Sequence, residues 1–292
     1  MQFECEVCQA NKLQGAQYGQ LPPREAIMTP WEEVHVDLIG PWRIQLGPRT
    51  VEFNALTCID PVTNIVELIR VDNKTAAHVS QQFQNAWLAR YPWPKRCVHD
   101  NGGEFTGIEF QSMLQQAAIR DRPTTSRNPQ SNAICERMHQ TVGNVLRTLM
   151  HGHPPQDQEE ASNVVDNALA TAMHATRTAA SRSLGYQSPG SIVFQRDMFL
   201  NVPFLADLQA LRERRQLIID ENLRRQNAKR RHHDYTIGES VHVRAIKPGK
   251  LDVRGLGPFP ITQVHANGTL TIQRAPHITE RLNLRRVYPH RP

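Results

Sequence analysis

The sequence predicts an α/β domain, followed by a helical connector and a small β-barrel. Three observations favour this order. Apolar residues with the spacing of strands and helices recur from Val34 to about residue 200. One long, charged helix candidate then runs over about 204–234. The remaining residues form short β-like runs separated by Gly, Pro and Asn-Gly turns.

Strand and helix patterns alternate in the first half of the α/β domain. In order, the sequence predicts strands over 34–40, 51–60 and 64–71, a helix over 74–91, a strand over 96–100 and a helix over about 107–119. We expect Phe110, Met113 and Leu114 to be buried by the last of these helices. The two strands 51–60 and 64–71 are joined by a short Asp-Pro-Val-Thr turn.

The next helix has a clear start. Asn128 is a good N-cap and Pro129 suits the first helical position, where a missing N–H costs nothing. Its predicted apolar stripe contains Ile134, Met138, Val142, Val145 and Leu149, whereas Glu136, Gln140 and Gly143 fall on another face. An alanine-rich helix over about 160–178 and the segment "SPGSIVFQRD" complete the domain.

Charge is unevenly distributed along the chain. The net charge is +6, yet the segment from Phe204 to Pro292 holds 17 Lys and Arg against 8 Asp and Glu. A basic C-terminal third favours a polyanionic partner such as nucleic acid. No run of 18 apolar residues predicts a membrane span, and the first residues lack the pattern of a secretory signal. The five cysteines favour a reducing compartment over a disulfide framework.

Three carboxylates lie at positions that suggest chemistry. Asp37 is inside the first predicted strand, where a charge among apolar neighbours is costly unless it is paired. Asp100 ends a later strand directly before Asn-Gly-Gly, and by itself it is equally explained as a turn residue. Glu136 lies off the apolar stripe of its helix, and by itself it is explained as a solvated carboxylate.

These carboxylates converge if their two strands are neighbours and the helix packs across the strand ends. Three ionised carboxylates so close together repel one another, so they need divalent cations. Hard oxygen ligands favour Mg²⁺ or Mn²⁺ over Zn²⁺. Two such ions, roughly 3.5–4 Å apart, activate an attacking oxygen and stabilise a leaving oxygen in phosphoryl transfer.

The segments that carry these carboxylates resemble a known family. "VHVDLIGPW", "CVHDNGGEF" and "NPQSNAICERMHQT" are similar to the three blocks of a retroviral-type integrase core, including the spacing of Asp, Asp, 35 residues and Glu. The wider sequence resembles integrases of Ty3/gypsy-type long-terminal-repeat retrotransposons. "CEVCQANK" resembles the end of that family's zinc domain, and "GLGPFPI", "NGTLTI" and "NLRRVYP" resemble its C-terminal GPY/F module.

The resemblance implies a fold, a reaction and a site. Asp37, Asp100 and Glu136 would be the catalytic triad and would bind two Mg²⁺ or Mn²⁺ ions. The core would be ribonuclease-H-like, a five-stranded mixed sheet flanked by helices, and the C-terminal module an SH3-like β-barrel. The reaction would be 3′-end processing of element DNA and its strand transfer into target DNA. The partners would be double-stranded DNA and further copies of the chain, with a chromatin contact through the C-terminal module. The chain would act in the nucleus, after a stage in a cytoplasmic nucleoprotein particle.

The same resemblance predicts domain boundaries and supporting residues. The expected parts are a zinc-domain remnant over 1–20, the catalytic core over 21–200, a helical basic connector over 201–236 and the β-barrel over 237–292. The residues expected to contact DNA are Asn101, Arg137, His139, Gln140, Lys229, Arg230, Arg231, Arg285 and Arg286. For Arg137 and His139 a solvated helix position is the alternative. The segment "AKRRHH" is also compatible with a nuclear-entry signal, but a charged helix end is the commoner explanation of such a run.

Two features depart from the family pattern. Ala133 stands where the family often has Gly, and His99 stands where it commonly has Ser; we expect His99 to point to the strand face opposite Asp100, because adjacent residues alternate. Cys5 and Cys8 have zinc-ligand spacing, but a structural zinc needs four ligands and only four residues precede Cys5. We therefore expect a chain truncated at its N-terminus, without an intact zinc site.

Two other functions compete with an active integrase. One is a catalytically silent, integrase-derived protein that binds DNA or chromatin through its basic tail. The other is a true ribonuclease H, which shares the core fold. The intact set of three carboxylates favours an enzyme over the silent protein. The basic β module and the single glutamate separated from Asp100 by 35 residues argue against a ribonuclease H.

Overall fold

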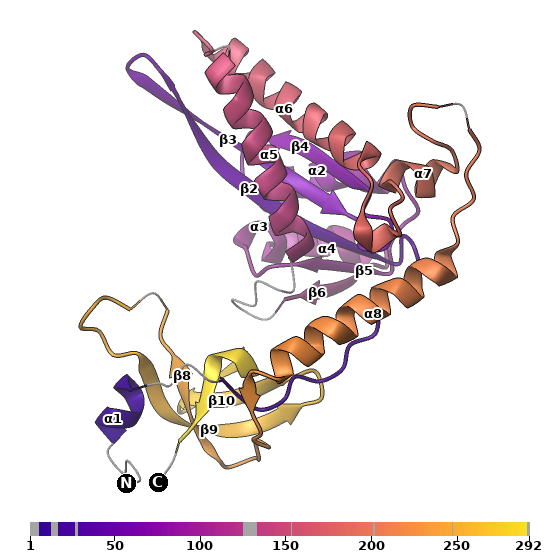
Figure 1. Cartoon of the computed structure of the whole chain (residues 1–292). Coiled ribbons are helices and arrows are strands. Elements are labelled where there is room, and N and C mark those ends of the chain that lie inside the picture. The colour runs from indigo at the N-terminus through magenta and orange to yellow at the C-terminus, as the bar shows by residue number, and fades with distance from the viewer. Residues whose placement is uncertain are drawn as a thin grey trace. The chain divides into compact units, whose positions relative to one another are not determined.

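The computed structural model describes residues 6–12, 17–26, 29–124, 133–152, 154–200, 202–246 and 248–290. The chain divides into two compact units (Figure 1). The core unit is Ala26–Arg215, and the terminal unit combines Met1–Glu25 with Gln216–Pro292. Among the described helices, none has the length and apolar character needed to cross a membrane.

The core unit is built on a five-stranded mixed sheet. Its strand order is β4-β3-β2-β5-β6. The strands are β2 (Glu33–Leu46), β3 (Arg49–Ile59), β4 (Val66–Val71), β5 (Arg96–His99) and β6 (Arg120–Pro123). β2, β3 and β4 pair antiparallel, whereas β5 runs parallel to both β2 and β6. This arrangement confirms the predicted sheet.

One strand is longer than the sequence pattern predicts. We expected Gly40-Pro41 to end the first strand, but β2 continues to Leu46 through an irregularity between Ile39 and Trp42. Gly40 has φ +117°, and a Cβ there would lie 2.7 Å from the carbonyl oxygen of Phe53. Only glycine fits such a close backbone approach, so the Gly-Pro pair marks a bulge instead of a strand end.

Helices cover both faces of this sheet. They are α2 (Ala76–Phe83), continued by the π-helical η1 (Gln84–Leu88), then α3 (Gly103–Thr106), α4 (Ile108–Gln116), α5 (Ala133–Gly152), α6 (Gln158–Thr178), η3 (Arg182–Leu184) and α7 (Pro189–Phe194). In Figure 1, α5 and α6 lie over one face, and α2, α3 and α4 lie behind the other. Local capping explains several starts: Thr75, Asp157 and Ser188 each accept a hydrogen bond from the first turn of α2, α6 and α7.

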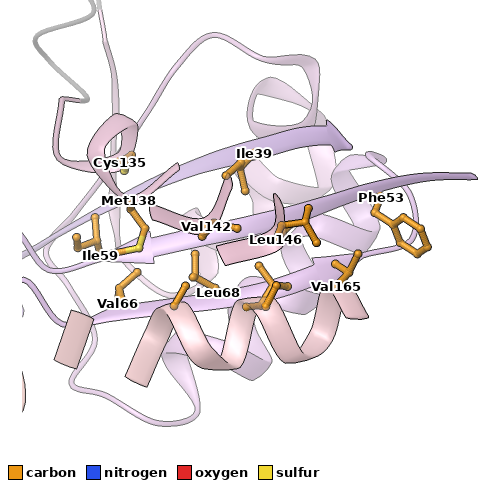
Figure 2. Close-up of a cluster of buried hydrophobic side chains, with 14 of the residues drawn as sticks. Ile39, Phe53, Ile59, Val66, Leu68, Cys135, Met138, Val142, Leu146 and Val165 are labelled. Carbon is orange, nitrogen blue, oxygen red and sulfur yellow. The ribbon is translucent and has the colours of Figure 1, made fainter. Parts of the chain in front are cut away.

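Each face of the sheet has its own apolar core. On the face covered by α5 and α6, Met138, Val142 and Leu146 of α5 pack with Ile39 of β2 and Ala55 of β3 (Figure 2). This confirms Met138 and Val142 as inward residues, with Val145 and Leu149 partly buried beside them.

On the other face, Phe110, Met113 and Leu114 of α4 are buried, as predicted. They pack with Val34, Val36 and Leu56 of the sheet. The predicted cap at Asn128 and Pro129 lies outside the described residues.

The terminal unit contains a second five-stranded sheet. Its order is β11-β10-β9-β8-β12, and all its pairs are antiparallel. The strands are β8 (Ser240–Arg244), β9 (Gly255–His265), β10 (Thr269–Ala275), β11 (Ile278–Asn283) and β12 (Val287–Pro289), with η4 (Leu284–Arg286) before the last. Val241, Ile261 and Leu270 are buried in its core, with Phe259 packed against them. This sheet matches the predicted SH3-like module.

The terminal unit also contains a strand pair and a short helix that the sequence pattern does not predict. β1 (Gln17–Tyr18) pairs in parallel with β7 (Arg230–Arg231). The short helix is α1 (Glu6–Asn11). The long charged helix expected over about 204–234 is α8 (Leu208–Asn227), which begins in the core unit and ends before β7. Residues from both ends of the chain therefore complete this unit.

Candidate functional site

Asp37 lies in the middle of the core sheet, on the face covered by α5. Its register partner on β3 is Thr57. Val34 and Val36 face the α2–α4 core, whereas Ile39 faces the α5–α6 core. Because side chains alternate along a strand, Asp37 shares the face of Ile39. Asp37 itself is half-buried.

Asp100 directly follows β5, the strand beside β2. His35 of β2 and Val98 of β5 are register partners in a parallel pair. Asp37 follows His35 by two residues and Asp100 follows Val98 by two, so both aspartates belong to the next row and the same face. Asp100 also forms a turn, because its Oδ1 accepts a hydrogen bond from the Gly102 N–H at 2.9 Å. The ligand and turn interpretations of Asp100 are therefore compatible.

Glu136 belongs to α5, the helix that covers this face. Its side chain lies outside the described residues, as does that of Arg137. One turn further along α5, Nε2 of His139 is 3.3 Å from Oγ1 of Thr57, the register partner of Asp37. The backbone of α5 at Glu136 is thus one helical turn from His139, which contacts the register partner of Asp37.

The donor set suits a hard divalent cation. Asp37 and Asp100 supply carboxylate oxygens, the ligands that Mg²⁺ and Mn²⁺ prefer. Within the part of the chain that the structure describes, no group of three His, Cys, Asp or Glu side chains is positioned to hold a metal ion. A third ligand from α5 would come from Glu136. The two aspartates therefore fit such an ion, with Glu136 needed to complete the set.

His99 points away from the candidate site. Its ring stacks on Phe105 with centroids 5.3 Å apart and meets Phe110 edge-on at 6.0 Å. Its Nε2 is 2.5 Å from Oδ1 of Asp121. Phe105 and Phe110 belong to the core on the α2–α4 face, so the prediction that His99 faces away from Asp100 is confirmed.

The residues predicted to contact DNA near the triad differ in their surroundings. Asn101 is exposed, and its Nδ2 donates to the carbonyl oxygen of Thr124 at 3.2 Å. Gln140 is exposed on α5. His139 turns toward the sheet, and burial lowers its pKa to about 4. His139 is therefore not the solvated helix residue of the alternative interpretation.

In the terminal unit, one predicted phosphate contact needs correction. Arg230 is only 8% exposed, and its guanidinium donates to the carbonyl oxygens of Gly19, Tyr18 and Leu284. A guanidinium enclosed by backbone carbonyls is not available to DNA. The charge run "KRRHH" gave no sign of this burial, because the accepting carbonyls belong to distant residues.

The other basic residues predicted to contact DNA keep more solvent access. Lys229 and Arg231 are exposed. Arg285 is half-buried and donates to Oε1 of Gln226 at 2.6 Å. Burial and the neighbouring Arg24 and Arg230 charges lower the pKa of Arg285 to about 10. Arg286 is half-buried, and its guanidinium donates to the carbonyl oxygen of Arg244.

The predicted zinc pair is only partly described. Cys8 lies on α1 and is half-buried. Cys5 lies outside the described residues. The expectation that the chain lacks an intact zinc site therefore stays a prediction.

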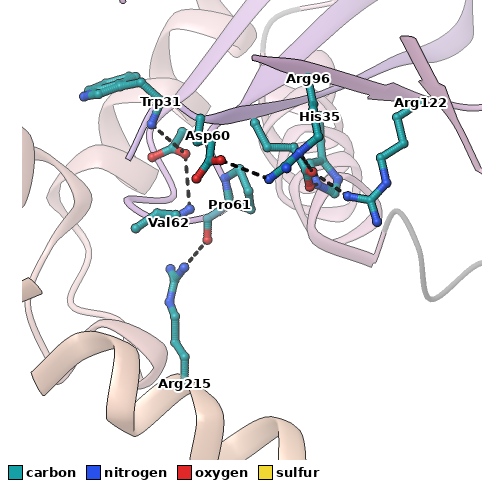
Figure 3. A network of polar contacts seen from close by, with 10 residues as sticks. Trp31, His35, Asp60, Pro61, Val62, Arg96, Arg122 and Arg215 are labelled. Carbon is teal, nitrogen blue, oxygen red and sulfur yellow. Dashed lines mark hydrogen bonds and ion pairs between the residues drawn. The ribbon is translucent and has the colours of Figure 1, made fainter. Parts of the chain in front are cut away.

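A buried ionic cluster near the aspartates was not predicted. Glu33 is 2% exposed, and its carboxylate contacts the side chains of His35, Arg96 and Arg122 (Figure 3). A signal for it exists in the sequence: in "EVHVDL", Glu33, His35 and Asp37 alternate with apolar residues, which indicates one polar face of a strand.

The mixed sheet and its two helical layers match the ribonuclease-H-like core that the sequence predicts. No family model matches the chain. Over 153 residues, 51% of this chain, it is 27% identical to the Transposon Tf2-3 polyprotein of Schizosaccharomyces pombe, and the Tf2-4 polyprotein of that yeast matches equally. The chain spans about a tenth of these relatives, 11% of their length.

One solved structure shows a likeness in fold over nearly the whole chain. A chain of the simian T-cell lymphotropic virus intasome, determined in complex with a PP2A regulatory subunit, has a TM-score of 0.65 and 15% identity. The match covers 98% of this chain and 87% of that chain. The HTLV-2 integrase catalytic core domain in complex with magnesium has a TM-score of 0.44 and 15% identity, over 58% of this chain and 99% of that chain. The resemblance to an integrase of a long-terminal-repeat retrotransposon is confirmed, and the Ty3/gypsy type is consistent with it.

Proposed function

We propose that this chain is the integrase part of a retrotransposon polyprotein and that it joins the 3′ ends of element DNA to target DNA. Removal of a terminal dinucleotide would precede the joining where the end is not already free. The observation that carries the proposal is the shared row of Asp37 and Asp100 on the sheet face that α5 covers. The similarity to transposon polyproteins supports it.

In this proposal Asp37, Asp100 and Glu136 hold Mg²⁺ or Mn²⁺. Such ions, when bound, activate an attacking oxygen and stabilise a leaving oxygen in phosphoryl transfer. The chain's own contribution is to set the ligands. Two observations support this: β2 and β5 pair in parallel up to two residues before the aspartates, and α5, the helix of Glu136, packs on β2 and β3. Three carboxylates held so closely bind cations because their mutual repulsion is relieved.

The partners follow from the reaction. Double-stranded DNA is the substrate, both as element end and as target. The exposed Lys229 and Arg231 of the terminal unit suit non-specific phosphate contacts, which weaken as salt rises. We further propose that the chain acts as a homo-oligomer on paired DNA ends in the nucleus, and that the C-terminal module contributes a chromatin contact.

Strand transfer of a labelled duplex end in Mg²⁺ or Mn²⁺ tests the proposal. The unaltered chain is compared with Asp37→Asn and Glu136→Gln, and with Glu109→Gln as the matched control. Glu109 is exposed on α4, on the opposite face of the sheet. Each triad variant should lose at least about 100-fold in activity, since even residues that only support metal ligands contribute 10–100-fold. The control should keep full activity.

Two outcomes would count against the proposal. Equal product from the unaltered chain and Glu136→Gln would remove Glu136 from the reaction. An unaltered chain that binds DNA in a salt-dependent way, takes up Mn²⁺ weakly and forms no product would instead favour the silent DNA-binding protein.

A further inference from the structure

The face of the sheet that carries the aspartates also carries a set of charged residues in register with them. β2, β5 and β6 run parallel, so their residues form rows across the sheet. The two rows before the aspartates are Glu33, Arg96 and Arg120, and then His35, Val98 and Arg122. Asp37 and Asp100 occupy the following row. The charged rows therefore lie directly beside the candidate active site.

A buried carboxylate organises these rows. Oε2 of Glu33 accepts hydrogen bonds from Nε of Arg96 at 3.0 Å and from the Arg122 guanidinium at 2.7 Å. Oε1 of Glu33 is 2.9 Å from Nε2 of His35. Burial alone would raise the pKa of Glu33, but the hydrogen bond and charge of His35 and the charge of Arg122 outweigh it and lower the pKa to about 2. Glu33 is thus a fixed negative charge that orients Arg122 (Figure 3).

Arg122 retains the capacity to bind an anion. A guanidinium has five N–H donors in a planar fork, and the contact with Glu33 is through one terminal nitrogen. The Arg122 side chain is 58% exposed. Arg120 is exposed on the same strand, and all four residues of β6 are exposed. On this face, the two rows hold three guanidinium groups and one carboxylate, so the face is positive; Glu32 also contacts Arg96, whereas Arg120 and Arg122 remain exposed.

We propose that Arg120 and Arg122 bind backbone phosphates of the DNA strand whose 3′ end lies at Asp37 and Asp100. This inference rests on the proposed function. Glu33 is a positioning residue, because it holds the guanidinium of Arg122 without touching DNA. Arginine suits this task because its fork matches two phosphate oxygens.

The spacing of the rows sets which phosphates are reached. A strand rises about 3.3 Å per residue, so the row of Arg122 is roughly 7 Å from the row of Asp100. DNA rises about 3.4 Å per nucleotide along one strand. Arg122 should therefore contact a phosphate within about two nucleotides of the reacting end. Arg120, roughly 13 Å from the row of Asp100, should contact one about four nucleotides from that end.

A simpler role for these arginines is protection of a sheet edge. Charged residues on an edge strand discourage pairing with another chain. That role predicts no effect on DNA binding. The salt dependence of DNA affinity separates the two roles, because each lost phosphate contact in duplex DNA lowers the slope of log K against log salt by about 0.9.

The first experiment measures this slope for the full chain with a fluorescent DNA duplex. The variants are Arg122→Ala and Arg120→Ala, with Arg49→Ala as the matched control. Arg49 is exposed at the start of β3, about 30 Å from Asp37 along the strands. Each β6 variant should lower the slope by about 0.9, and the control should not. Arg120→Ala leaves the contacts of Glu33 intact, so it carries the test if Arg122→Ala fails to fold.

The second experiment locates the contact. Arg122→Cys is exposed to duplexes that carry a thiol tether at single phosphates, and disulfide cross-linking is compared with that of Arg49→Cys. Cross-linking should concentrate at phosphates within about two nucleotides of the 3′ end. This pattern would support the phosphate site even if the chain does not catalyse strand transfer. Failure of strand transfer would contradict the proposed function alone. Unchanged slopes with cross-linking no greater than that of the control would overturn the phosphate site, even if strand transfer succeeds.

Discussion

Nε2 of His139 lies 3.3 Å from Oγ1 of Thr57, the residue that pairs with Asp37 across β2 and β3. This contact joins α5 to the sheet one helical turn after Glu136. Together with the burial of Met138 and Val142, it holds α5 against the sheet face of Asp37. The sheet face of the proposed cation site is therefore covered by α5.

The burial of His139 should make stability depend on pH. Its pKa in the folded chain is lowered to about 4 by burial, against about 6.5 when exposed. A depressed histidine pKa means that the folded state binds fewer protons than the unfolded state. The contribution of His139 to the free energy of unfolding is therefore complete above about pH 6.5 and is lost as the pH falls toward 4.

Urea unfolding between pH 7 and pH 4 measures this effect. Discounted for partial exposure, His139 should account for a loss of about 2 kcal/mol in the free energy of unfolding over that range. His139→Gln should show a correspondingly flatter pH dependence. Identical pH profiles for the two proteins would mean that His139 is not buried as described.

The ion pairs around Glu33 should contribute more to the free energy of unfolding than an exposed ion pair does. Glu33→Gln removes a buried charge that binds Arg96, Arg122 and His35, and it should lower the free energy of unfolding by about 3 kcal/mol. Glu52→Gln is the control, because Glu52 and Arg43 form an exposed pair with a distance of 2.7 Å. It should cost less than about 1 kcal/mol. Similar losses for both variants in denaturant unfolding would contradict the assignment of Glu33 as a buried anchor.

Arg230 should stabilise the terminal unit and should not contact DNA. Arg230→Ala removes the donor to the carbonyl oxygens of Gly19 and Tyr18, so hydrogen exchange of residues 17–19 should accelerate. The salt dependence of DNA binding should stay unchanged. The exposed Arg231 is the comparison: Arg231→Ala should lower the salt slope by about 0.9 if it contacts a phosphate. A lower slope for Arg230→Ala with unchanged exchange would restore it as a DNA contact.

Much of the core unit could be predicted from the sequence because its signals are local. Alternation placed His99 on the face opposite Asp100, and helical spacing identified Met138 and Val142 as inward residues. The convergence of Asp37 and Asp100 needed one further assumption, that their strands are neighbours. The register of β2 and β5 confirms that assumption.

The features that escaped prediction depend on contacts between distant residues. Arg230 belongs to a run of charges, and its burial follows from the pairing of β1 with β7. No local sequence pattern predicts the pairing of two two-residue strands that are more than 200 residues apart in the chain. The Glu33 cluster likewise needs β6 to lie beside β5, since Arg122 shows no partner within its own segment.

Binding of Mn²⁺ to the full chain, followed by calorimetric titration, tests the shared cation site most directly. The unaltered chain should bind Mn²⁺, and Asp37→Asn, Asp100→Asn and Glu136→Gln should each weaken the affinity at least about tenfold, whereas Glu109→Gln should not. Glu136→Gln with the Mn²⁺ affinity of the unaltered chain would show that the helix carboxylate does not join the two aspartates around a common ion.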